Sequence, residues 1–276
     1  MSSEDPQHRQ LHGFFFPLMA YGHMIPMFDI ARMFASRGVK ATIITTPANA
    51  STFSNATEIN RLLNLDINVQ ILQFPAKEVG LTEGCENLDD LDALDTIHTF
   101  LKAVNMLQQP LERLLEDYQP DFIVADFTLH WATESAAKFG IPRDSEIKSY
   151  GVLVNSFYEL EPAYADYYRN IMGRRAWQIG PVSLRNNNNI DKAQRGKRST
   201  VDEHYVLNWL DSKEPNSVLY ICFGSTSKMN NAQLLEIAMA LEDLEFSFVW
   251  VIRKLRPTKK RVFYPNVSKR KRKERV

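Results

Sequence analysis

Short apolar runs alternate with stretches of helical spacing along most of the chain. The runs predict strands over residues 14–16, 39–46, 69–74, 122–126 and 150–157. Between them, apolar residues three and four positions apart predict helices over 24–35, 57–65, 94–115, 131–139 and 161–172. Strands that alternate with helices favour an α/β fold, in which helices cover both faces of a parallel sheet.

Proline and glycine indicate where these helices begin, bend and end. Pro26 suits the first turn of the helix over 24–35, and Gly38 follows the end of that helix. Pro110 lies inside the long helical pattern over 94–115. Because a proline inside a helix removes one backbone hydrogen bond, we expect the helix to kink there.

A polar stretch separates this region from a second, shorter α/β pattern. Residues 185–199 include four consecutive asparagines and have the composition of a linker. Beyond them, the pattern predicts a helix over 205–210, a strand over 218–223, a helix over 232–241 and a strand over 248–252. We expect two strands and a few helices to leave apolar faces uncovered.

The net charge of zero conceals an uneven distribution. Residues 254–276 contain 11 Lys or Arg and one acid, which leaves a net charge of −10 on the remainder. We interpret this basic tail as a solvated, disordered end. The alternative is a non-catalytic protein whose tail binds nucleic acid or another anion, and for this chain we consider a nucleic-acid partner the weaker interpretation.

Cysteine usage and hydropathy bear on the cellular compartment. Cys85 and Cys222 are too few and too far apart for a disulfide framework or a zinc site, and they suit a reducing compartment. Residues 1–10 lack the apolar stretch of a secretory signal, and no run of about 18 apolar residues could span a membrane. We therefore expect a cytoplasmic protein without a membrane span.

The most informative pair of residues is His23 and Asp126. Asp126 closes the apolar run over 122–125, and His23 opens a helix after the first predicted strand. Ligands of parallel sheets bind beyond the carboxyl ends of the strands, so both residues should lie at one rim of the sheet. A carboxylate there can hold an imidazole as a neutral base, which can take a proton from a hydroxyl.

Each member of this pair also has a structural interpretation. A helix start disfavours imidazolium, which supports a neutral His23, but the residue pattern by itself favours a helix-capping or surface histidine. Asp126 could be the N-cap of the helix that follows it, and such a cap is compatible with a histidine contact. His98, His130 and His204 lie in or near helical patterns and are interpreted as structural.

Other motifs narrow the chemistry. Gly224, Ser225 and Thr226 follow a predicted strand and precede a helix, where backbone N–H groups and hydroxyls can cradle a phosphate. Such junctions commonly contain Gly and Ser, so this signal is weak by itself. The sequence contains no GxGxxG, no GxxxxGK[ST], no HExxH and no Cys/His cluster, so it predicts no dinucleotide, P-loop or metal site.

Several segments together resemble the plant UDP-dependent glycosyltransferases of family 1. The first carries His23 in the sequence FPLMAYGHMIP, and another carries Asp126 in VAD. The remaining similar segments are 38–47, 131–133, 139–142, 154–162, 179–182, 209–211 and 220–225. The resemblance covers nearly all of residues 11–254 and is greatest to the branch that glucosylates flavonoids and other phenolics.

The resemblance implies a fold of GT-B type with two Rossmann-like domains, the second incomplete. It implies an acceptor-binding domain over 11–183, a linker over 184–200 and a nucleotide-sugar-binding domain over 201–253, before the basic tail over 254–276. It further implies a phenolic acceptor and a UDP-sugar donor, with UDP-glucose expected, and neither a metal nor a cofactor.

The resemblance also assigns roles to individual residues. His23 would deprotonate the acceptor hydroxyl, and Asp126 would orient His23 and stabilise its charged form. The acceptor oxygen would then displace UDP with inversion at the sugar carbon. Ser225, together with Gly224 and Thr226, would contact the donor phosphates.

Two departures from the family pattern put activity in doubt. Family members carry several tens of additional residues after the position of Arg143, including part of the acceptor pocket. The donor signature, which runs from Trp-Ala-Pro-Gln through His-Cys-Gly-Trp-Asn-Ser to a Glu/Asp-Gln pair, is absent from the sequence. We therefore expect an inactive or impaired transferase. The alternatives are a non-catalytic truncated product and a decoy that sequesters phenolics.

Overall fold

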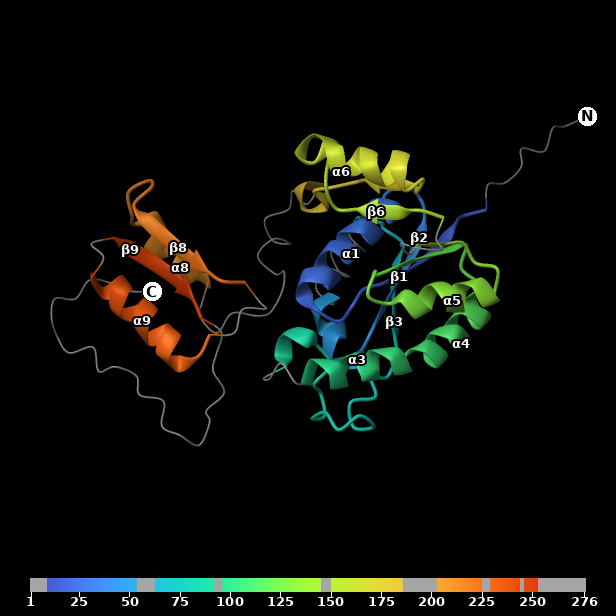
Figure 1. Cartoon of the computed structure of the whole chain (residues 1–276), viewed down its shortest axis with the longest axis horizontal. Coiled ribbons are helices and arrows are strands. Elements are labelled where there is room, and N and C mark those ends of the chain that lie inside the picture. The colour runs from blue at the N-terminus through green and yellow to red at the C-terminus, as the bar shows by residue number, and fades with distance from the viewer. Residues whose placement is uncertain are drawn as a thin grey trace, which may run out of the picture. The chain divides into compact units, whose positions relative to one another are not determined.

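The computed structural model describes residues 9–53, 63–91, 96–144, 150–185, 203–224, 229–243 and 246–252. The chain divides into two compact units, Met1–Lys197 and Arg198–Val276 (Figure 1). The predicted helix over 57–65 falls mostly outside the described residues, and 63–64 form a turn. The basic tail over 254–276 and most of the linker over 184–200 also lie outside them.

The first unit is built on a five-stranded sheet in the order β3-β2-β1-β4-β5. Its strands are β1 (His12–Phe16), β2 (Lys40–Thr45), β3 (Ile67–Ile71), β4 (Phe122–Ala125) and β5 (Arg143–Asp144). Every neighbouring pair is parallel, which confirms the prediction from the alternation of strands and helices. The pattern did not predict β5, because its two residues are too few to form a periodic signal.

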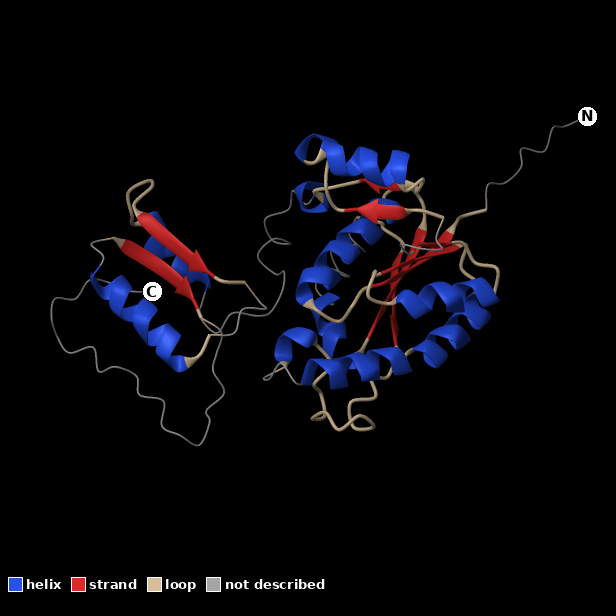
Figure 2. Cartoon of the chain, in the orientation of Figure 1, coloured by secondary structure: helices blue, strands red, loops and turns tan. Residues whose placement is uncertain are grey.

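Helices cover both faces of this sheet (Figure 2). The main ones are α1 (Tyr21–Ala35), α3 (Thr96–Met106), α4 (Gln108–Tyr118) and α5 (His130–Lys138). Successive side chains of a strand point to opposite faces. Phe14 and Phe16 accordingly pack with buried residues of α3, α4 and α5, whereas Phe15 packs with buried residues of α1. The three consecutive phenylalanines therefore anchor β1 in both halves of the core.

The helix α1 begins at Tyr21, three residues before the predicted start. His23 thus lies in the first turn of α1, and Pro26 lies inside the helix, so the expectation that Pro26 occupies the first turn is wrong. The backbone N–H of Tyr21 donates to the carboxylate of Asp89 at 2.8 Å. A contact across 68 residues of sequence supports the early start, and apolar periodicity cannot reveal it.

The long helical pattern over 94–115 is divided into α3 and α4 at Leu107, so the expected kink at Pro110 is also misplaced. Pro110 is the third residue of α4. Proline is tolerated in a first turn because the backbone N–H groups there have no partner within the helix. Leu107 is fully buried between the two helices.

The first unit also contains a small two-stranded sheet. It consists of β6 (Val152–Val154) and β7 (Ala176–Gln178), which pair in parallel. The strand predicted over 150–157 is shorter than expected, and β7 was not predicted. Between them lie η2 (Tyr158–Leu160), α6 (Pro162–Asp166) and a π-helical turn (Tyr167–Ile171), and η4 (Val182–Arg185) follows β7.

The second unit contains α8 (Glu203–Asp211), β8 (Val218–Cys222), α9 (Asn231–Asp243) and β9 (Ser247–Val251). All four correspond to predicted elements, and β8 pairs with β9 in parallel. Among the described residues of this unit, Trp209 and Leu241 are the only buried hydrophobic side chains. Large apolar side chains on β8 and α9, such as Tyr220 and Met239, are exposed, as expected for so small a sheet.

None of the described helices combines the length and the apolar character needed to cross a bilayer.

The difference in burial predicts a difference in local stability. Backbone amides of β8 and β9 should exchange with solvent faster than those of β1, β2 and β4, because opening the small sheet exposes little buried apolar surface. Hydrogen exchange measured by mass spectrometry on peptides covering 218–222 and 40–45 checks this. Equal protection in the two sheets would contradict it.

Candidate active site

The site lies where the strand order of the large sheet reverses direction. β2 and β3 lie on one side of β1, whereas β4 and β5 lie on the other. The connections that leave β1 and β4 therefore diverge to opposite faces, which is the arrangement at which open parallel sheets commonly bind ligands. His23 follows β1 and Asp126 follows β4, so the topology brings both residues to this point.

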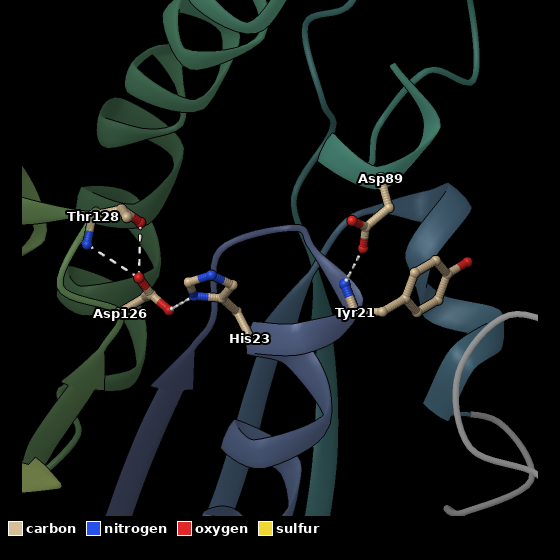
Figure 3. A network of polar contacts seen from close by, with 5 residues as sticks. All are labelled: Tyr21, His23, Asp89, Asp126 and Thr128. Carbon is tan, nitrogen blue, oxygen red and sulfur yellow. Dashed lines mark hydrogen bonds and ion pairs between the residues drawn. The ribbon is translucent and has the colours of Figure 1, made fainter. Parts of the chain in front are cut away.

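The structure brings His23 and Asp126 into direct contact (Figure 3). The backbone N–H of Asp126 donates to the carbonyl oxygen of Phe16 at 2.9 Å, which ties this residue to the end of β1. Its Oδ2 atom lies 2.7 Å from Nδ1 of His23. Two residues 103 positions apart thus form a short hydrogen bond across the junction of β1 and β4.

Thr128 holds the second oxygen of the same carboxylate. The backbone N–H and the hydroxyl of Thr128 donate to Oδ1 of Asp126 at 3.1 and 2.8 Å. The N-cap of α5 is Leu129, so the interpretation of Asp126 as a helix N-cap is wrong. Instead, the carboxylate closes a local turn with one oxygen and contacts the imidazole with the other.

This arrangement determines which nitrogen of His23 can act as a base. In the neutral imidazole, Nδ1–H donates to Asp126, and the lone pair therefore resides on Nε2. No side chain or backbone group of the described residues forms a hydrogen bond with Nε2. The His23 side chain is 34% exposed and that of Asp126 is 8% exposed, so the base is accessible while its partner is shielded.

The two groups shift each other's pKa in opposite directions. The hydrogen bond to Asp126 raises the pKa of His23 above its ordinary value against the effect of burial, and the charges of Asp126 and Asp89 add to the rise. Burial alone would raise the pKa of Asp126, but hydrogen bonds from His23 and Thr128 and the His23 charge outweigh it, so this pKa is lowered. The helix start was expected to lower the pKa of His23, but the carboxylate of Asp126 has a larger and opposite effect.

Two further residues at the site were missed by the sequence analysis. The ring of Phe127 lies 6.2 Å from the His23 ring, centroid to centroid, and its side chain is 63% exposed. Because Phe127 directly follows Asp126 in the sequence, its place at the site could have been predicted. Asp89 contacts the start of α1 from a distant loop, and nothing in the local sequence indicates that contact.

The remaining candidates do not join this site. Gly224 lies in a turn after β8 with φ +77°, a conformation that favours glycine, and Ser225 and Thr226 lie outside the described residues. His98, His130 and His204 are exposed on helices. Within the part of the chain that the structure describes, no three side chains are grouped to hold a metal ion.

The sequence matches no protein-family model. It is, however, 42% identical to scopoletin glucosyltransferase of Nicotiana tabacum over 313 aligned positions, which take in 88% of this chain and 66% of that protein. UDP-glycosyltransferase 73B3 of Arabidopsis thaliana is 39% identical over 91% of this chain and 68% of its own length. The chain thus spans about two thirds of the length of the curated relatives it matches.

Both alignments are longer than the chain, at 313 and 326 positions against 276 residues. The relatives therefore carry additional residues inside the matched region. That these residues belong after Arg143 stays a prediction, because the length of an alignment does not locate its gaps.

Solved structures show the same likeness. UGT73P12 of Glycyrrhiza uralensis, complexed with glycyrrhetinic acid 3-O-monoglucuronide, superposes with a TM-score of 0.81 at 33% identity, over 91% of this chain and 64% of that one. UGT89C1 of Arabidopsis thaliana, complexed with UDP, superposes with a TM-score of 0.80 at 28% identity, over 94% and 69%.

The His23–Asp126 pair should make stability depend on pH. Because the pKa of His23 is raised in the folded state, this residue contributes to folding stability. The contribution is complete below the unfolded pKa of 6.5 and is lost as pH rises through the folded pKa. The lowered pKa of Asp126 gives a contribution that is present above the unfolded value of 3.8 and is lost as pH falls through the folded value. The ion pair therefore stabilises the fold most between the unfolded pKa of Asp126, 3.8, and the unfolded pKa of His23, 6.5.

Asp126→Asn removes the charge and keeps an oxygen that can accept a hydrogen bond. At about pH 5 it should lower the free energy of unfolding by about 1–2 kcal/mol, less than for a fully buried charged pair, because His23 is partly exposed. The loss should be smaller at about pH 9, because the contribution of His23 is lost as pH rises through its folded pKa. Urea denaturation at both pH values measures it, with the exposed Asp117→Asn as control. An equal loss at both values would refute the ion-pair contribution.

Proposed function

Because this chain belongs to the plant UDP-glycosyltransferase family, we propose that it provides the acceptor-activating half of an inverting sugar transfer from a UDP-sugar to a phenolic hydroxyl. The observation that carries the proposal is the 2.7 Å contact between His23 and Asp126 at the switch point of the first sheet. The architecture is that of the GT-B fold of the family's solved members, with two α/β units built on parallel sheets.

In the proposed reaction, His23 acts as the general base. Its Nε2 atom accepts the proton of the acceptor hydroxyl while Nδ1–H remains bonded to Asp126. The freed oxygen forms a bond to the anomeric carbon from the side opposite UDP. The bond from that carbon to the phosphate oxygen breaks, and UDP leaves with the bonding electrons. One displacement inverts the configuration of the sugar, and the proton remains on His23.

The carboxylate of Asp126 assists the charge change of this step. When His23 takes the proton, a cation forms 2.7 Å from a fixed anion. The raised pKa of His23 reflects the same stabilisation, because the hydrogen bond to Asp126 is its largest cause. Since Thr128 holds the other oxygen of Asp126, the carboxylate does not need to reorient as the charge develops.

Two features of the site support a phenolic acceptor. A phenol has a pKa near 10, within reach of an imidazole whose affinity for protons is raised, whereas an aliphatic hydroxyl is far less acidic. The exposed ring of Phe127 beside His23 offers an aromatic surface on which a flat acceptor can stack. Relatives are named for scopoletin and anthocyanin, and one solved structure of UGT89C1 contains quercetin.

For the donor, we propose UDP-glucose. Several relatives are named glucosyltransferases, whereas a structure of UGT89C1 contains UDP-L-rhamnose. The turn at Gly224, with Ser225 and Thr226, is the proposed contact with the donor phosphates. We place the protein in the cytoplasm, since Cys85 and Cys222 are free thiols, which suits a reducing compartment.

The 276 residues by themselves should bind UDP-glucose negligibly and show no measurable turnover. Nanomolar to micromolar binding needs about 8–12 kcal/mol, whereas one or two hydrogen bonds from the turn at Gly224 contribute about 0.5–1.5 kcal/mol each. The donor signature that would supply the rest does not occur in the sequence. Calorimetric titration with UDP-glucose and a product assay on a phenolic acceptor test this. Saturable turnover would contradict it.

The role of His23 is tested by supplying a complete donor half. We expect residues 1–197, completed with the family residues expected after Arg143 and joined to the nucleotide-binding half of a full-length relative, to transfer glucose to a phenol. His23→Ala should then lower kcat by about 10²–10⁴-fold, the usual contribution of a general base. His98→Ala, an exposed histidine on α3, is the matched control and should leave kcat unchanged. A chimera without turnover, or one insensitive to His23→Ala, would overturn the proposal.

A further inference from the structure

A buried carboxylate outside the His23–Asp126 pair holds the start of α1. Asp89, in η1 (Leu88–Asp90), is only 7% exposed. Its Oδ2 atom accepts the backbone N–H of Tyr21, the first residue of α1, at 2.8 Å (Figure 3). The N-cap of α1 is Ala20, which has no side chain able to cap the helix. Asp89 therefore performs from 68 residues away the function that an N-cap side chain normally performs.

The loop that carries Asp89 is itself anchored at several points. The backbone N–H of Leu88 donates to the carbonyl oxygen of Met19 at 2.7 Å, next to the start of α1. The side-chain oxygen of Asn87 accepts the N–H of Asp89 at 2.9 Å, and its Nδ2 donates to Asn49 at 2.8 Å. The carboxylate is thus held in place by the connections that follow both β1 and β2.

A further anchor comes from the residue at the start of this loop. Glu86 accepts the backbone N–H of Ala48 at 2.8 Å through Oε2. Residues 47–53 are helical, so this second buried acid bonds to the beginning of another helix. The loop over 86–89 therefore supplies carboxylates to the starts of two helices that follow neighbouring strands.

The position of Asp89 also has an electrostatic consequence. Helix starts attract anions, and here a carboxylate of the chain itself occupies that place at α1. His23 lies two residues beyond Tyr21 in the same turn. The charged groups that act on His23 among the described residues are Asp126, after β4, and Asp89, in η1, and both favour the imidazolium. Carboxylates on two separate elements thus favour the charged imidazole, Asp126 by direct contact and Asp89 by its charge alone.

We propose that Asp89 is a positioning residue for His23. Its carboxylate holds the first turn of α1, which carries the imidazole, and adds a second negative charge toward the imidazolium that forms when the acceptor gives up its proton. The catalytic consequence rests on the proposed function. The helix contact and the charge effect are properties of the fold and can be measured without turnover.

The test separates the contact from the charge. Asp89→Asn keeps an oxygen for the N–H of Tyr21 but removes the charge, whereas Asp89→Ala removes both. The pKa of His23, followed by NMR titration in the full chain and assigned by the signal lost in His23→Gln, should fall in both variants. The melting temperature should remain near the wild-type value in Asp89→Asn and fall by about 2–4 °C in Asp89→Ala.

The matched control is Glu83→Gln, which removes a charge from the preceding part of the same loop. Glu83 forms an exposed ion pair with Lys77, so neither the pKa of His23 nor the melting temperature should change. An unchanged pKa of His23 in Asp89→Asn would overturn the proposal and leave Asp89 as a helix contact only. A lowered pKa together with an inactive chimera would sustain the positioning role while refuting the proposed function.

Discussion

The hydrogen bond between His23 and Asp126 depends on β1 and β4 being neighbours in the correct register. Phe16 pairs with Ala125, so Asp126 emerges one residue beyond the paired strands. A slip of one residue would turn this side chain to the opposite face of the sheet. Gly13 helps to set the register, because a Cβ atom at that position would lie 2.3 Å from the ring of Phe122 on β4. The chemistry at the rim therefore depends on packing at the other end of the strands.

The site also shows how a fold compensates for burying acids. Asp126 and Asp89 are both largely removed from water. Each instead accepts a backbone N–H, from Thr128 and Tyr21 respectively, and Asp126 contacts the imidazole in addition. These donors compensate for the lost hydration. The charges of Asp126 and Asp89 also raise the affinity of His23 for a proton. The contacts that stabilise the fold here are therefore the same ones that would assist the proposed proton transfer.

The two units differ in how completely they enclose their sheets. The first buries apolar side chains on both faces of its five-stranded sheet, and this packed frame holds the ends of β1 and β4 side by side. In the second, the described residues form a two-stranded sheet with much exposed apolar surface. This contrast agrees with the proposed function, which assigns different steps to the two units. In the proposed function, proton transfer belongs to the well-packed unit, and the donor signature that would bind the UDP-sugar does not occur in these 276 residues.

Sequence alone determined the features that repeat locally or follow the order of elements along the chain. Apolar periodicity indicated four strands of the large sheet, the elements of the second unit and the parallel α/β class. Because the carboxyl ends of parallel strands share one rim, the chain order also brought His23 and Asp126 together in the prediction. The family resemblance added their roles, which local patterns alone leave open between catalysis and capping.

Tertiary structure decided whatever depends on contacts between distant segments. It placed the start of α1 at Tyr21 through Asp89, moved the helix break from Pro110 to Leu107, and raised the pKa of His23 where the helix start alone would lower it. The physical reason is common to all three. Propensities and helix dipoles are weak local effects, and a buried carboxylate or a packed leucine brought in from elsewhere in the chain outweighs them.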